Sequence, residues 1–194
     1  MGKPFLMSKN KETQIFNVYN YKYEILYSRC NEENFDSLNI YGDDIMGGEM
    51  KYIGNLKNGK KHGYGILKFK DGLEYKGQFA DNFISGYGII KCHEKNYEGF
   101  WEKNQKHGEG IETYCDGRIY RGNFLYDKKD GYGEFSWPNG SRFKGTFKAG
   151  KQDGEGIFIF SNGSVKRGLW KNGKRVNWIE EINPPNSATN DNKD

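Results

Sequence analysis

Glycine recurs at a fixed period through the middle of this 194-residue chain. Of the 27 glycines, 23 lie between residues 52 and 176, where similar units follow one another. Five units are complete (52–74, 75–96, 97–119, 120–142 and 143–165), and a sixth, 166–176, is partial. A period of this length is typical of repeat proteins, so each unit is expected to be one supersecondary element that stacks on its neighbours.

Fixed positions within the unit indicate a β-hairpin. Position 1 is aromatic in all complete units, position 3 is glycine and position 5 is large and apolar. Their alternation with mostly polar residues places them on one face of a strand. A turn ending in the glycine of position 12 is expected next. A second strand then has glycine at position 14 and mostly apolar or aromatic residues at 16 and 18. Pairs such as Asp116-Gly117 favour a tight connecting turn.

The pattern therefore predicts an all-β fold, an elongated, twisted, single-layer antiparallel sheet of successive β-hairpins. Two strands per unit give about ten or eleven strands. Glycine normally weakens a strand, so its recurrence at positions 3 and 14 needs a reason. We expect these glycines to leave floor space on which rings lie nearly flat, since a single layer must cover its own apolar face.

Composition and charge exclude other classes. The chain has no apolar run long enough for a transmembrane helix, and 16% aromatic residues argue against a disordered chain. Cys30, Cys92 and Cys115 are odd in number and loosely spaced, which argues against a disulfide framework or a zinc site. The N-terminus lacks the pattern of a secretory signal, so a cytoplasmic protein is expected.

The third unit has the most complete motif, with Tyr97-Glu98-Gly99, Trp101, Lys106-His107-Gly108, Gly110 and Asp116-Gly117. It closely resembles the membrane occupation and recognition nexus (MORN) repeat. The resemblance covers about 125 residues. It implies a scaffold that attaches to proteins or membranes, because similar arrays occur in ciliary radial spoke head proteins and in cytoskeletal scaffolds. Position 11, histidine in the family, departs at Ser85, Asp130 and Asp153, so that side chain has no uniform role.

No site for a reaction is expected, so the chain is predicted not to be an enzyme and to have no metal or cofactor. His62 and His107 fall one per hairpin at position 11, without cysteine or carboxylate at ligand spacing, which favours a turn-stabilising role. Pairs such as Gly63-Tyr64-Gly65 precede no helix, so they are not phosphate loops.

Two sets of residues are candidate binding sites. The first is an aromatic face for a partner peptide or helix, and it comprises Tyr52, Tyr75, Tyr97, Trp101, Tyr120, Phe124, Trp137, Phe143, Phe147 and Trp170. The second is a basic patch for anionic lipid or an acidic partner, and it comprises Lys57, Lys60, Lys61, Lys166, Arg167, Lys171, Lys174 and Arg175.

The leading hypothesis is a non-catalytic scaffold that mediates protein–protein interactions in a cytoskeletal assembly, either a ciliary axoneme with its radial spokes or a submembrane cortex. One alternative is an anionic phospholipid-binding module that recruits partners to a membrane. Another is the regulatory subunit of an enzyme supplied in trans. Free sheet edges also allow strand pairing with a partner or a homo-oligomer. Nucleic acid is not an expected partner, because the rings are committed to the sheet face.

The two ends of the chain lack the repeat motif. Residues 1–51 are expected to be an N-terminal extension that is partly strand, from the alternation over Tyr19–Tyr27, and a possible cap of the first unit. A short strand near Leu38–Tyr41 is a further expectation. Residues 177–183 are expected to cap the final edge, and 184–194 to form a disordered tail.

Overall fold

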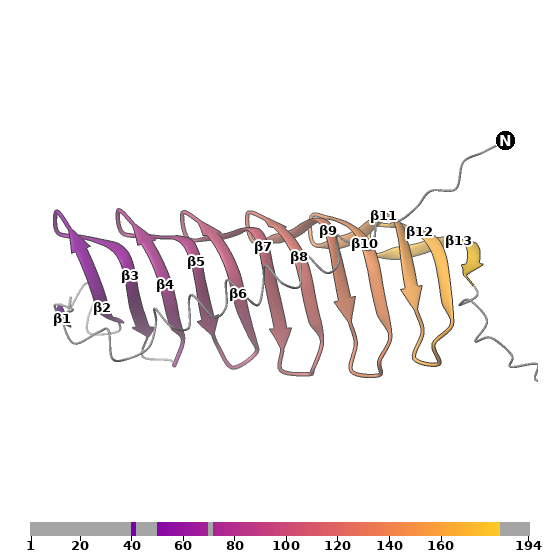
Figure 1. Cartoon of the computed structure of the whole chain (residues 1–194), viewed down its shortest axis with the longest axis horizontal. Helices are drawn as coiled ribbons and strands as arrows, with labels where there is room; N and C mark the ends of the chain where they lie inside the picture. Colours follow the sequence, from indigo (N-terminus) through magenta and orange to yellow (C-terminus); the bar gives the residue numbers. More distant parts are fainter. Residues whose placement is uncertain (1–39, 42–49, 70–71, 183–194) are drawn as a thin grey trace, which may run out of the picture. The chain divides into compact units, whose positions relative to one another are not determined.

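The computed structural model describes residues 40–41, 50–69 and 72–182, and these form a single open antiparallel sheet (Figure 1). Each strand pairs with the next in chain order, without a crossover. The strands are β1 (Ile40–Tyr41), β2 (Met50–Lys57), β3 (Lys60–Phe69), β4 (Glu74–Ala80), β5 (Phe83–Lys91), β6 (Lys95–Glu102), β7 (Gln105–Tyr114), β8 (Ile119–Leu125), β9 (Lys128–Ser136), β10 (Arg142–Lys148), β11 (Lys151–Ile159), β12 (Val165–Lys171) and β13 (Lys174–Ile182). The predicted all-β sheet of successive hairpins is confirmed.

The sheet has 13 strands, more than the predicted ten or eleven. The difference arises at the two ends, where strands form outside the glycine pattern. β1 pairs with β2, and β13 pairs with β12 and continues through residues 177–182. The predicted strand over Tyr19–Tyr27 and the predicted tail 184–194 lie outside the described residues.

Each repeat hairpin has a turn of only two residues, at positions 7 and 8. In the third repeat these are Lys103 and Asn104, with φ of 47° and 69°. Two successive positive φ values fit the tight turn whose twist matches a β-hairpin. The predicted longer turn ending at position 12 is therefore wrong. Gly108 instead lies within β7 at φ 71°, opposite a register shift between Gly99 and Trp101. Here glycine serves a bulge.

Neighbouring repeats are joined at these turns by backbone and side-chain hydrogen bonds. The Asn104 amide donates to the Ile84 carbonyl at 2.9 Å, and the Ile84 amide donates to Asn104 Oδ1 at 2.7 Å. Lys106 and Asp127 repeat the same exchange one unit later, at 3.0 and 2.9 Å. Polar side chains at position 8 thus satisfy the backbone where the strand ladder is interrupted.

The glycines of positions 3 and 14 form one continuous row across the sheet. Each position-3 glycine from Gly77 to Gly145 pairs with the position-14 glycine of its own hairpin and with that of the preceding one, and Gly54 and Gly168 end the row with one glycine partner each. The row comprises Gly54, Gly65, Gly77, Gly88, Gly99, Gly110, Gly122, Gly133, Gly145, Gly156 and Gly168.

The ring of position 1 lies directly on this row. A Cβ atom added at Gly110 would lie 2.5 Å from the Tyr97 ring, and one at Gly65 would lie 2.5 Å from the Tyr52 ring. Atoms cannot approach so closely, so no residue with a side chain fits beneath the rings. The predicted glycine floor is confirmed.

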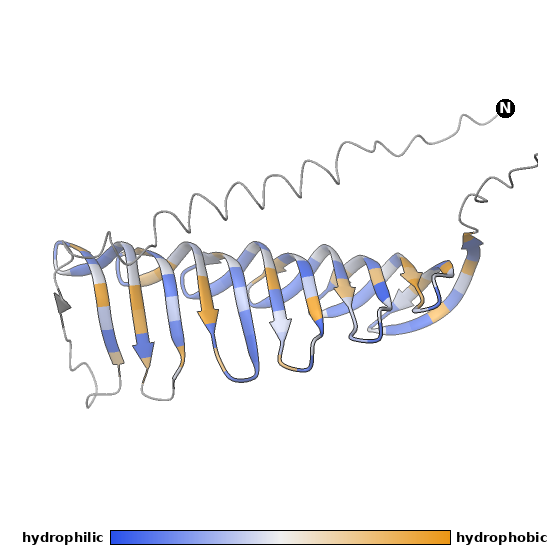
Figure 2. Ribbon diagram, turned by 60° about the horizontal axis from the view of Figure 1, so that its bottom comes forward, coloured by the Kyte–Doolittle hydropathy of each residue, from blue (hydrophilic) through white to orange (hydrophobic). Residues whose placement is uncertain are grey.

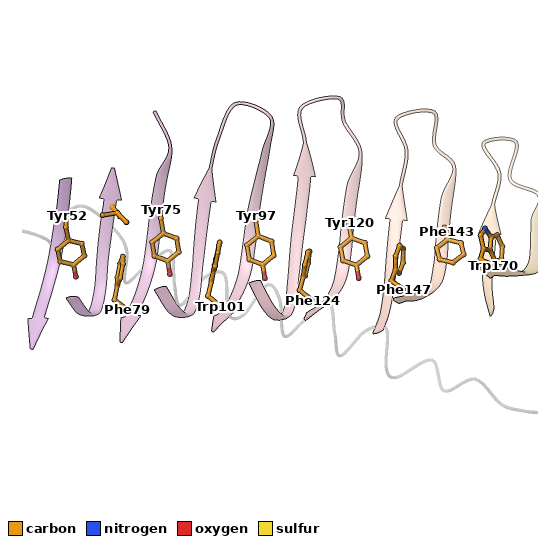
Figure 3. Close-up of a cluster of buried hydrophobic side chains, with 11 residues drawn as sticks. Tyr52, Tyr75, Phe79, Tyr97, Trp101, Tyr120, Phe124, Phe143, Phe147 and Trp170 are labelled. Atoms are coloured by element: carbon orange, nitrogen blue, oxygen red, sulfur yellow. The ribbon is translucent and has the colours of Figure 1, made fainter. Parts of the chain in front are cut away.

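The rings of positions 1 and 5 interlock along the array (Figure 3). In that view the position-1 tyrosines face the reader and the position-5 rings stand edge-on between them. Tyr97 contacts Trp101 of its own repeat at 5.1 Å between ring centroids and Phe124 of the next repeat at 5.0 Å, with interplanar angles of 88° and 85°. Edge-to-face pairs of this kind are favourable. The same alternation links Tyr52 to Trp170 and forms the core of the single layer.

The opposite face of the sheet is more polar and is laced by ion pairs. Glu74 lies 3.3 Å from Lys68 on the neighbouring strand β3 and 3.2 Å from Lys76 on its own strand β4. Hydrophobic and hydrophilic residues alternate along the strands, as Figure 2 shows. The two faces therefore differ in chemistry, and the large apolar surface lies on the ring side.

Candidate functional site

Most of the predicted aromatic binding face is core. Nine of its ten rings are at most 7% exposed, from Tyr75 at 0% to Trp101 at 7%, and Trp137 is half-buried. The rings of position 1 have glycine beneath them, and the rings of positions 1 and 5 lie beside one another, so little of their surface is open to a partner. A role for these residues in binding stays a prediction.

A second line of rings on the same face is half-buried and more accessible. It comprises Tyr114, Phe135, Trp137, Phe158, Phe160 and Trp178, and we call it the aromatic row. Successive ring centroids are 6.3, 4.7, 5.6, 4.8 and 5.7 Å apart. The row lies beside the core because positions 1 and 16 pair directly, as Tyr120 does with Phe135. It forms a continuous ring surface along the last three repeats.

Basic side chains from position 10 cover several core rings. Lys106 Nζ lies 4.9 Å from the Tyr97 ring centroid, and Lys129 Nζ lies 5.1 Å from that of Tyr120. Arg175 lies over Trp178 at 4.3 Å, at the far end of the aromatic row. Each lysine stem shields a ring from water while its ammonium group is attracted to the ring face. Tyr97 and Tyr120 are thus held between the glycine row and a lysine side chain.

Position 1 favours tyrosine because its hydroxyl has a partner. Tyr97 donates to the Phe100 carbonyl at 2.8 Å, and Tyr52, Tyr75 and Tyr120 donate to the corresponding carbonyls at 2.8–2.9 Å. Burial raises the pKa of Tyr52 to about 12, so the hydroxyl stays a donor at neutral pH. Phe143 lacks this bond but keeps the ring contacts.

A charged cluster interrupts the apolar face in the third repeat. Glu112 occupies position 16, where other repeats have residues such as Leu67 and Phe135, and it is only 3% exposed. Its Oε1 lies 2.6 Å from Lys106 Nζ and 3.2 Å from Lys95 Nζ, and its Oε2 lies 2.9 Å from Lys129 Nζ. The Tyr114 hydroxyl donates to the same carboxylate. We call Glu112, Lys95, Lys106 and Lys129 the lysine cluster.

The titration of these groups reflects their surroundings. Burial alone would raise the pKa of Glu112, but hydrogen bonds from Lys106, Tyr114 and Lys129 outweigh it and hold that pKa well below its ordinary value. Burial and the neighbouring carboxylate raise the pKa of Tyr114. Burial lowers the pKa of Lys129, and the nearby ammonium groups of Lys95 and Lys106 lower it further, although Glu112 opposes both effects.

The sequence-based site prediction did not include Glu112, Lys95, Lys106 or Lys129. A signal was present, since a carboxylate at an otherwise apolar position of a repeat requires a partner in the folded chain. The sequence did not show which lysines pair with this carboxylate, because that depends on the register of the strands. The aromatic row was visible as a pattern at positions 16 and 18, but its greater exposure was not.

The predicted basic patch divides into two parts in the structure. At the C-terminal end Lys166 pairs with Glu181 at 3.3 Å, Arg167 with Glu155 at 2.5 Å and with Glu180 at 3.4 Å, and Lys171 with Asp153 at 3.1 Å.

At the first turn, Lys57 and Lys60 are exposed, and the ammonium of Lys61 lies 5.5 Å from the Tyr52 ring. Much of the C-terminal positive charge is therefore neutralised locally, whereas that of the first turn is open to solvent.

The remaining candidate side chains are scattered. His107 Nδ1 lies 3.5 Å from Glu102 of its own hairpin, and His62 Nδ1 lies 4.0 Å from Asp81 of the next repeat. Within residues 40–41, 50–69 and 72–182 no three His, Cys, Asp or Glu residues gather as metal ligands. The same stretches contain no helix long and apolar enough to cross a membrane.

An open sheet of stacked hairpins, with aromatic rings packed on a row of glycines, defines a β-repeat protein. The MORN repeat model matches residues 52–74, 75–93, 97–117, 120–142 and 143–165, which is more than half of the chain. The chain belongs to the MORN repeat family.

Among solved structures, the wild-type TCP10 domain of CPAP from Danio rerio is similar at 13% identity. The similarity covers 77% of this chain and 80% of that chain, with a TM-score of 0.31. A score this low supports no inference about function.

Proposed function

We propose that this chain is a non-catalytic scaffold that binds other proteins along its aromatic row within a cytoskeletal assembly, such as a ciliary axoneme with its radial spokes or a submembrane cortex. MORN repeats are interaction modules for proteins or membrane lipids. A cytoplasmic location with cytoskeletal or ciliary association is part of the proposal. Fluorescence imaging of the tagged chain tests it, and a uniform cytosolic signal would contradict it.

The observation that supports protein binding is the half-exposed aromatic row. Six rings in mutual contact present apolar surface over β7, β9, β11 and β13. Contiguous apolar surface of this kind marks interaction sites in soluble proteins. A bound peptide or helix would cover the rings on the side that the sheet leaves open.

The membrane alternative has less support in the geometry. Anionic lipid binding gains about 1 kcal/mol for each basic residue near the surface. Lys166, Arg167 and Lys171 already have acidic partners within 3.4 Å, so their net attraction to a membrane is reduced. The open lysines of the first turn are too few for stable attachment by themselves.

Proximity labelling with the tagged full chain tests the scaffold proposal. Trp137→Ala combined with Phe160→Ala removes two rings from the middle of the row. Tyr132→Ala is the matched control, because Tyr132 is 61% exposed and belongs to neither the core nor the row. We expect the double variant to lose labelled cytoskeletal neighbours while the control keeps them. An unchanged set of neighbours in the double variant would contradict the proposal.

A further inference from the structure

The lysine cluster has more positive charge than its surroundings neutralise. Lys95, Lys106 and Lys129 share the single carboxylate of Glu112. The adjacent Arg118 has its own partner, Asp116, at 2.7 Å. No other carboxylate pairs with these three lysines within the part of the chain that the structure describes. The cluster therefore keeps a net charge of about +2 beside an apolar surface.

This excess charge lies where water is scarce. The side chains of Lys106 and Lys129 are 13% and 14% exposed, and only Lys95 is well exposed, at 42%. Partly desolvated ammonium groups that repel one another are costly for the free protein. A second carboxylate arriving at the cluster would relieve that repulsion and gain charge-assisted hydrogen bonds.

The cluster also adjoins the aromatic row. Lys129 Nζ lies 5.1 Å from the Tyr114 ring centroid and 5.8 Å from that of Phe135, the first two rings of the row. A ligand on the rings would thus reach the ammonium groups with a neighbouring side chain. A flat lipid surface could not, because the two shielded lysines lie on the sheet face among rings rather than on a protruding turn.

We infer that the lysine cluster recognises an aspartate or glutamate side chain of a partner protein whose flanking apolar residues lie on the aromatic row. This inference deepens the proposed scaffold function and rests on it. The partner segment is apolar, with an acidic residue at the end that meets the third repeat. Lys95, the most exposed member, makes the first contact, and Lys106 and Lys129 hold the carboxylate between rings.

The test begins with selection of peptides from a displayed random library against the full chain. We expect the selected peptides to share one acidic residue beside apolar or aromatic residues. One selected peptide is then synthesised with its acidic residue and with the matching amide, Glu→Gln or Asp→Asn. Affinities are measured by fluorescence anisotropy.

Two variants of the chain complete a double-mutant cycle. Lys95→Met removes the exposed cation without touching the core. The triple variant Glu112→Leu, Lys106→Met, Lys129→Met replaces the three shielded members of the cluster by apolar residues, a replacement that buried ion pairs often tolerate. Lys60→Met, in the exposed first turn, is the control for loss of one positive charge.

We expect the amide peptide to bind wild type about tenfold more weakly, in line with one charge-assisted hydrogen bond. The same exchange should have a clearly smaller effect on the triple variant, which keeps Lys95 as its one cation of the cluster, and Lys95→Met should weaken binding of the acidic peptide but not of the amide peptide. Lys60→Met should behave as wild type. Equal losses from the amide exchange in wild type and in the triple variant would overturn the inference while leaving ring-mediated peptide binding intact.

Other outcomes would point to a different ligand of the lysine cluster, or to none. If no selected peptide binds the full chain, and the double variant Trp137→Ala, Phe160→Ala keeps the labelled neighbours of wild type, the scaffold proposal itself fails. Binding to vesicles of anionic lipid that is lost in the triple variant would identify a membrane, rather than a peptide, as the ligand of the cluster. A concentration-dependent dimer in analytical sedimentation that is lost in the triple variant would identify a second copy of this chain as the partner. Either result overturns the inferred partner.

Discussion

Trp101 is the ring whose removal tests the core most directly. It is 7% exposed and contacts Tyr75 at 5.6 Å and Tyr97 at 5.1 Å between centroids. Its Nε1 donates to the Gly88 carbonyl at 3.2 Å. Because the sheet has one layer, no second layer can move in to fill the space that Trp101→Ala would leave.

The magnitude follows from burial. A tryptophan buries roughly 200 Å² on folding, which at about 25 cal/mol per Å² corresponds to about 5 kcal/mol, and alanine retains only a part of it. Tryptophan-to-alanine changes in cores lose about 3–5 kcal/mol. We therefore expect Trp101→Ala to lower the free energy of unfolding by about 3–5 kcal/mol.

Urea unfolding followed by far-UV circular dichroism measures the effect. Trp137→Ala is the matched control, since Trp137 is half-buried in the aromatic row, and we expect it to lose about 1–2 kcal/mol. Because repeats interact mainly with their neighbours, Trp101→Ala should also separate the transition into two steps. A loss below about 1 kcal/mol for Trp101→Ala would refute the interlocked-ring core.

Three further predictions concern the same face. Gly110→Ala would place a Cβ 2.5 Å from the Tyr97 ring, so it should lower the unfolding free energy by about 1–3 kcal/mol, whereas no measurable change would contradict the glycine floor. Tyr97→Phe removes only the hydroxyl bond at 2.8 Å, and it should cost about 1 kcal/mol with the ring contacts kept; a loss as large as that of Trp101→Ala would be inconsistent with this view.

The third concerns pH. The pKa of Glu112 is lowered on folding, so the unfolded chain takes up its proton first as the pH falls, and the stability due to this carboxylate is complete above the unfolded pKa of about 4.3 and is lost below it. In urea titrations at pH 7 and pH 3, the triple variant Glu112→Leu, Lys106→Met, Lys129→Met should therefore lose less stability than wild type, and an equal loss would exclude this carboxylate as a source of the pH dependence.

Much of the fold could be predicted because its determinants are local and periodic. Turn residues, alternating apolar positions and recurring glycines repeat every unit, so one unit predicts its neighbours. The predicted turn length was wrong, because the prediction assigned Gly108 to the turn, whereas it lies at a bulge within β7. A turn and a bulge both favour a glycine at positive φ, and the amino-acid sequence does not distinguish them.

The candidate site was predicted less well, because exposure depends on the register. Positions 1, 5, 16 and 18 are mostly aromatic or apolar, and the sequence ranks none of them by accessibility. In the structure the glycine floor and the cover from Lys106 and Lys129 bury the first two positions. The aromatic residues of positions 16 and 18 lie beyond the glycine row and stay partly exposed.

The sequence by itself determined the repeat, the hairpins and the need for a single self-covered layer, since these follow from side-chain size and backbone freedom within about 23 residues. Only the tertiary structure decided which rings are core and which remain accessible. It also brought Lys95, Lys106 and Lys129 around Glu112, from three strands and three repeats. Charge pairing across strands depends on register, and register is set by the whole sheet rather than by any one unit.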